Sequence, residues 1–132
     1  MYGNLDIISK QKFMMMTMNK KKIYISLPIA FHEDTVYKRN ECAKTYLETN
    51  YPKYDYISPI DTNHIDNEAL GNHLAIERTA YYMGRDIEQV ILCDAILMCP
   101  GWENSKGCKV EKFTAETYGK EVLFMNVMNK II

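Results

Sequence analysis

The chain has 132 residues, which is enough for one domain with a substantial core but too few for two. Its 47% hydrophobic and 25% charged residues are typical of a globular protein and exclude a disordered or fibrous one. Sixteen basic and seventeen acidic side chains leave a formal net charge of −1 without a basic patch, so no nucleic-acid polymer is predicted as a partner.

The sequence carries no signal for a membrane, for export or for a metal. No apolar run approaches the ~20 residues of a membrane span, and the amino terminus lacks the apolar segment and cleavage site of a signal peptide. The four cysteines show no metal-ligand spacing and are interpreted as reduced thiols of a cytoplasmic protein. The three histidines, His32, His64 and His73, also lack ligand spacing, so neither a metal nor another cofactor is predicted.

Residues 1–18 differ from the rest of the chain because they have no helical or strand period and end in a cluster of methionines. We interpret them as a disordered or artificially added extension, with a functional arm as the alternative. A single domain is then expected over residues 19–132.

Short apolar runs alternate with amphipathic stretches from Lys22 onward. In chain order, they predict a strand at 22–29, a helix at 33–50, a strand at 54–60, helices at 67–83 and 85–92, a strand at 95–99, a helix at 105–118 and a strand at 121–126. Strands that alternate with helices predict an α/β fold, with a parallel sheet covered on both faces. Ligands of such sheets bind beyond the carboxyl ends of the strands, which selects the loops at 27–34, 59–66 and 99–106.

The third loop leads into GWENSKGCKVE, residues 101–111. Ser105 can cap the helix that follows, and the first amides of that helix would then form an anion site. Gly107 would let a phosphate approach the backbone closely. An ordinary strand-to-helix turn gives the same pattern, so both interpretations stay open.

Glu111 lies on the same predicted helix. At helical spacing it shares a face with Cys108, Ala115 and Tyr118, which are uncharged, so its carboxyl group is expected to point into the protein. A buried carboxylate costs free energy unless it is paired. The alternative is a surface glutamate placed between two lysines.

A family resemblance rests on Tyr24, Asp86, Asp94 and the motif Ser105-x-Gly107-x-x-x-Glu111, taken in this order. The set resembles the nucleoside 2-deoxyribosyltransferase-like superfamily over residues 22–126. It looks closest to a short bacterial and phage branch, which is related to the 2-deoxynucleoside 5-phosphate N-hydrolases. The resemblance implies a three-layer, flavodoxin- or Rossmann-like parallel sheet of four to five strands in the order 2-1-3-4. It also implies a homodimer or a higher homo-oligomer.

The resemblance implies roles for individual residues. Glu111 would be a nucleophile that attacks the anomeric carbon and forms a covalent glycosyl-enzyme. Tyr24 would hold this carboxylate, and Asp86 would protonate the departing base or orient the sugar. Asp94 is expected to be structural. The phosphate-accepting hydrolases also carry a serine at the position of Ser105, whereas nucleoside-specific transferases carry an acidic residue there. The resemblance therefore favours a nucleotide as the substrate.

Three further residues are candidates for ligand binding. Trp102 would stack on the base or the ribose, or else it is a tryptophan buried in its loop. Asp61 and His32 follow the second and first predicted strands and would contact the ligand, although the loop at 26–34 lacks the glycine and arginine of the phosphate hydrolases. The function predicted is cleavage or transfer of an N-glycosidic bond. The alternative is a non-catalytic module that binds a nucleotide-derived, ADP-ribose-like ligand.

Overall fold

The computed structural model describes residues 20–29, 33–62 and 75–126. In chain order these residues form β1 (Lys22–Ser26), the 3-10 turn η1 (Glu33–Thr35), α2 (Val36–Asn50), β2 (Asp55–Ile57), α3 (Pro59–Thr62), α5 (Ala75–Leu92), β3 (Ala95–Met98), the 3-10 turn η2 (Trp102–Asn104), α6 (Lys106–Thr117) and β4 (Glu121–Phe124). The predicted extension at 1–18 lies outside the described residues.

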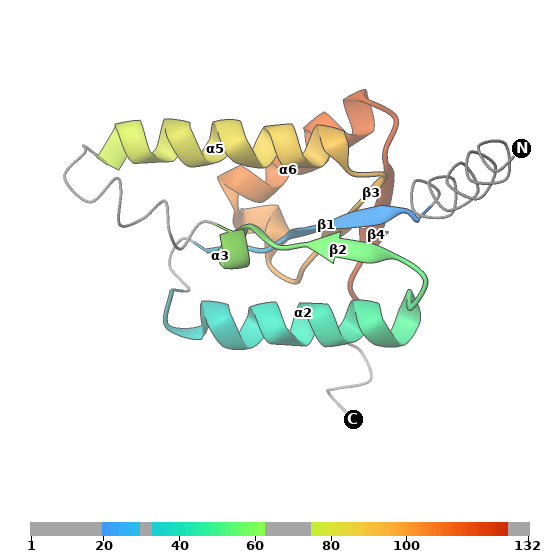
Figure 1. Cartoon of the computed structure of the whole chain (residues 1–132). Helices are drawn as coiled ribbons and strands as arrows, with labels where there is room; N and C mark the ends of the chain where they lie inside the picture. The colour runs from blue at the N-terminus through green and yellow to red at the C-terminus, as the bar shows by residue number, and fades with distance from the viewer. Residues whose placement is uncertain (1–19, 30–32, 63–74, 127–132) are drawn as a thin grey trace, which may run out of the picture.

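The four described strands form one parallel sheet in the order β2-β1-β3-β4. The central strand β1 pairs with both β2 and β3, and Tyr24 lies opposite Ile57 on one side and Ile96 on the other. α2 covers one face of the sheet and α5 and α6 cover the other (Figure 1). The predicted α/β architecture and strand order are therefore confirmed.

The alternation of side chains along β1 divides the core in two. Ile23 and Ile25 point to the α2 face, where they pack with buried residues of that helix such as Ala43 and Leu47. Tyr24 lies between these two residues, so its side chain points to the other face and packs against α5 and α6. Because successive residues of a strand point to opposite faces, Ser26 points to the same side as Tyr24.

The predicted helices at 67–83 and 85–92 are corrected by the structure. One helix, α5, runs without a break through Gly84, while residues 67–74 lie outside the described part of the chain. A glycine inside a helix costs about 1 kcal/mol relative to alanine, and the apolar face that α5 buries outweighs this cost. All four predicted strands are shorter than expected, and the short segments α3 and η2 were not predicted.

The helix α6 begins and ends as its sequence predicts. The Ser105 hydroxyl accepts a hydrogen bond from the backbone amide of Cys108 at 3.2 Å and so caps the first turn. Gly119 ends the helix with φ at 72°, in the left-handed region that glycine adopts without strain. Within the described ranges, no helix has the length and apolar character to cross a membrane. All four cysteines are free thiols.

Candidate active site

Glu111 points from α6 into the protein and is only 5% exposed. Together with Cys108 and Ala115 it forms the buried face of the helix, as the helical spacing predicts. The fourth member of the predicted face, Tyr118, is 60% exposed because the helix has ended there. Glu111 is therefore not a surface residue, and its carboxylate needs partners in the interior.

Two hydroxyl groups of β1 supply these partners. The Tyr24 hydroxyl donates to Oε2 of Glu111 at 2.7 Å, and the Ser26 hydroxyl donates to Oε1 at 2.6 Å. Both donors are fully buried, with 0% exposure. Since Tyr24 and Ser26 are two residues apart on a strand, they share a face and present both hydroxyls to one carboxylate.

A second carboxyl group lies beside the first. Asp86 on α5 is 9% exposed and close enough to Glu111 to affect its ionisation. Burial raises the pKa of Glu111 from its ordinary value of 4.5 to about 8, the hydroxyls of Ser26 and Tyr24 oppose this shift, and the charge of Asp86 adds to it. Burial and the charge of Glu111 also raise the pKa of Tyr24 well above its ordinary value, so the phenol stays a neutral donor.

Glu111 and Asp86 line a pocket of about 340 Å³ that lies beyond the carboxyl ends of β1 and β3. Its lining combines apolar side chains with the two carboxyl groups and the start of α6; the lining residues are Leu27, Ile29, Thr79, Tyr82, Met83, Asp86, Ser105, Gly107, Cys108 and Glu111. A larger hollow of about 540 Å³ lies against α2 and Met125, but it does not contain the buried pair of carboxyl groups.

The start of α6 forms one edge of the pocket. Ser105 is partly buried, and its hydroxyl is engaged in capping the helix. A methyl group added at Gly107 would lie 3.5 Å from the sulfur of Met83, an ordinary van der Waals contact. The protein itself therefore does not require glycine at this position, and Gly107 lines the pocket.

Trp102 and Asp61 do not line this pocket in the described part of the structure. The Trp102 ring lies 5.8 Å from the ring of Phe124, and the Lys112 ammonium group lies 5.2 Å from its centroid, so the side chain is used in packing between η2, α6 and β4. His32 lies outside the described residues.

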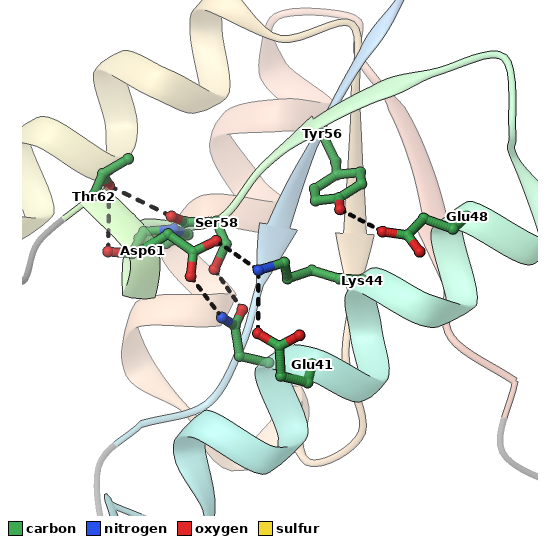
Figure 2. A network of polar contacts seen from close by, with 9 residues as sticks. Glu41, Lys44, Glu48, Tyr56, Ser58, Asp61 and Thr62 are labelled. Atoms are coloured by element: carbon green, nitrogen blue, oxygen red, sulfur yellow. Dashed lines mark hydrogen bonds and ion pairs between the residues drawn. The ribbon is translucent and has the colours of Figure 1, made fainter.

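Asp61 belongs to a polar network after β2 that ties α2 to α3 (Figure 2). Its carboxylate accepts a hydrogen bond from Asn40 at 3.0 Å and pairs with Lys44 at 3.1 Å. Ser58 donates to the Asn40 side chain at 2.5 Å, and both of these residues are 1% exposed. Asp61 thus has a structural partner for each of its carboxylate oxygens.

Asp94 lies at the opposite edge of the sheet. Its carboxylate accepts from the Lys22 amide at 2.9 Å, and its own amide donates to the Lys22 carbonyl at the same distance. This pairing joins the amino ends of β1 and β3, which agrees with a structural role.

Ser26 is a residue of the site that the sequence analysis missed. The run at 22–29 is mostly apolar and predicts a buried strand, and the serine within it was not among the candidate site residues. The signal was nevertheless present, because a serine two residues after a candidate tyrosine on a strand must point to the same face.

Comparisons with known proteins give a family and a fold. A family model described as a domain of unknown function, DUF4406, matches residues 21–124. No curated protein matches the sequence. Among solved structures, a 2-deoxyribosyltransferase from the psychrotolerant bacterium Bacillus psychrosaccharolyticus is similar, with a TM-score of 0.57 and 18% identity over 84% of this chain and 76% of that one. It is described as a biocatalyst for the synthesis of antiviral and antitumoral nucleosides. At this identity the likeness shows a common fold.

Proposed function

We propose that this chain, which belongs to the DUF4406 family, is an enzyme that cleaves or transfers the N-glycosidic bond of a nucleoside or nucleotide, with Glu111 as its nucleophile. The observation that carries the proposal is the buried carboxylate of Glu111, held at both oxygens by hydroxyls and placed beside Asp86 at a pocket. Two carboxyl groups brought together out of water destabilise a fold. Such a pair is therefore better explained by chemistry than by stability.

The proposed reaction has two steps. The Glu111 carboxylate attacks the anomeric carbon while the bond from this carbon to the base nitrogen breaks and its electron pair moves to the base. Asp86 gives its proton to the departing base. Water, or a second base, then attacks the anomeric carbon of the glycosyl-enzyme and releases the carboxylate, with Asp86 taking back a proton.

Because the pKa of Glu111 is about 8, the proposed reaction starts from the fraction of the protein in which Glu111 is ionised and Asp86 holds the proton that the pair shares. The nucleophile must be ionised and the general acid must be protonated. Hydrogen bonds from Tyr24 and Ser26 favour the charge on Glu111, and Asp86 lines the pocket in which we place the departing base. A shared proton is the ordinary outcome when two buried carboxyl groups interact.

The pocket supports a nucleotide as substrate. Leu27, Ile29, Tyr82 and Met83 offer an apolar wall to a base, and Ser105 and Gly107 lie where the amino end of α6 favours an anion. The similar solved structure is a 2-deoxyribosyltransferase, which supports a base-to-sugar bond as the target. We therefore place a base on the apolar wall and a 5-phosphate near Ser105.

The proposal is tested by a screen of nucleosides and their 5-monophosphates, in which liquid chromatography detects the release of free base. A second base added to the mixture distinguishes transfer from hydrolysis. Glu111→Gln should abolish turnover and leave the ligand affinity within about tenfold. Glu116→Gln is the matched control, because this exposed glutamate of the same helix forms an ion pair with Lys112 at 3.2 Å. Base release by Glu111→Gln at the wild-type rate would overturn the nucleophile, and tight binding without turnover by the wild type would favour the non-catalytic alternative.

A further inference from the structure

Ser26 occupies a position where a hydroxyl is unusual. It is the last residue of β1, the central strand, and lies opposite Met98 of β3 with no exposed surface. The neighbouring residues on either side along the strand, Ile25 and Leu27, are apolar members of the core. A buried hydroxyl stabilises a fold only when it is hydrogen-bonded, and the partner of this one is Oε1 of Glu111 at 2.6 Å.

The two hydroxyls of β1 do different things for Glu111. A carboxylate held by one donor can still turn about its last side-chain bond. A second donor on the other oxygen fixes the plane of the group, since Tyr24 takes Oε2 while Ser26 takes Oε1. Both donors lie on one rigid strand, so the direction in which the free lone pairs point is set by the sheet.

We propose that Ser26 is a positioning residue for the reaction: its hydroxyl favours the ionised form of the Glu111 carboxyl group and orients it toward the anomeric carbon. This inference rests on the proposed function for its catalytic meaning. The hydrogen bond from this hydroxyl stabilises the carboxylate before the attack. It weakens as the ester forms, because the oxygen loses its negative charge, and it stabilises the carboxylate again when the sugar leaves. Ser26 does not itself contact the substrate in this scheme.

Four variants test the proposal. Ser26→Ala removes the hydroxyl, and Ser26→Val removes it while filling the space that water would occupy. Ser26→Thr has nearly the shape of Ser26→Val but keeps the hydroxyl, so this pair isolates the hydrogen bond from the packing. Ser58→Ala is the matched control, because Ser58 is an equally buried serine beyond the end of a strand whose hydroxyl donates to Asn40 outside the pocket.

The first measurement is the pKa of Glu111. It is obtained from a pH titration monitored by carbon-13 NMR, with protein labelled at the carboxyl groups of its glutamates. The Glu111 signal is the one that Glu111→Gln lacks. Ser26→Ala and Ser26→Val should raise its pKa by about one unit, Ser26→Thr should restore most of this change, and Ser58→Ala should leave it as in the wild type. An unchanged Glu111 pKa in folded Ser26→Ala and Ser26→Val overturns the inference.

The second measurement is the pH profile of turnover with a substrate found in the screen. The acidic limb of kcat/KM should move to higher pH by about one unit in Ser26→Val. At neutral pH kcat should fall about tenfold with KM little changed, because a tenfold smaller fraction of Glu111 is ionised. A loss of turnover that is equal at all pH values overturns the inference. If the wild type releases no base from any compound, the proposed function fails, and the NMR titration still decides whether Ser26 favours the ionised form of Glu111.

Discussion

The hydroxyl of Tyr24 donates a 2.7 Å hydrogen bond to Oε2 of Glu111 and so joins the central strand to a helix 87 residues later in the chain. Neither residue could make this contact within its own element. Glu111 therefore has its raised pKa and its fixed orientation only in the folded state, where α6 packs on the same face of the sheet as the Tyr24 ring. The predictions below use this dependence.

Tyr24→Phe keeps the buried ring and removes only the hydroxyl. The free energy of unfolding should fall by about 2 kcal/mol near pH 9, where Glu111 is ionised and would lose a charged hydrogen bond. Turnover at neutral pH should fall about tenfold or more, because the pKa of Glu111 rises. Urea unfolding and base release check the two effects. Tyr56→Phe is the control, since its hydroxyl donates to the exposed Glu48 at 2.6 Å, and its loss should cost no more than about 1 kcal/mol and leave turnover unchanged.

The stability of the wild type should depend on pH through Glu111. Its pKa is about 8 in the folded state and 4.5 ordinarily, so between these values the folded state binds more protons than the unfolded state. The stabilisation by this group is fully present below pH 4.5 and is lost as the pH rises through 8, by an amount on the order of a few kcal/mol. Glu111→Gln should flatten urea midpoints measured from pH 5 to 8.5. Glu116→Gln should keep the wild-type dependence of the urea midpoint on pH. If this dependence persists in Glu111→Gln, it arises from another titratable group.

Ser105→Asp and Ser105→Asn form a pair that differs in charge alone. Both side chains are good helix caps, so α6 and the melting temperature should be preserved. The aspartate should weaken binding of a nucleoside 5-monophosphate at least tenfold more than binding of the matching nucleoside, because like charges repel in a confined site. The asparagine should affect the two ligands alike. Calorimetry with both ligands checks this, and equal weakening by the aspartate would remove the phosphate from this edge of the pocket.

Gly107→Ala should separate folding from binding at the same edge. The added methyl group meets Met83 at an ordinary contact distance and raises helix propensity, so stability should stay the same or rise by up to about 1 kcal/mol. Because Gly107 and Met83 both line the pocket, the added methyl group should weaken ligand binding. Thermal unfolding and calorimetry on one preparation give both results. A destabilised protein would show that the start of α6 is more tightly packed than the Met83 contact indicates.

The fold was largely predictable because its signals are local. Alternating apolar runs and amphipathic stretches give the strands and helices, and Ser105 and Gly119 mark the limits of α6 correctly. The inward direction of Glu111 also follows from helical spacing alone. Gly84 misled the prediction because tertiary packing can outweigh the low helix propensity of glycine, and α5 packs against α6.

The contacts of individual side chains were less predictable because they are set by distant parts of the chain. Trp102 meets Phe124 of β4, and Asp61 meets Asn40 and Lys44 of α2. Strand position alone placed Asp61 near the carboxyl edge of the sheet, but it could not show that partners already occupy its carboxylate. Ser26 was different, because strand periodicity would have placed it beside Tyr24 if the two had been considered together.

The hydrogen bonds between Lys22 and Asp94 lie at the end of the sheet opposite to the pocket, so the two ends of the sheet can be engineered separately. At the amino edge, this pairing and the 3.0 Å ion pair of Lys20 with Asp55 hold neighbouring strands in register. At the carboxyl edge, β1 supplies the hydroxyls of Tyr24 and Ser26 that bind Glu111 of α6. A library that varies the apolar wall at Leu27, Tyr82 and Met83 would therefore search for new base specificities without disturbing the contacts that align the strands.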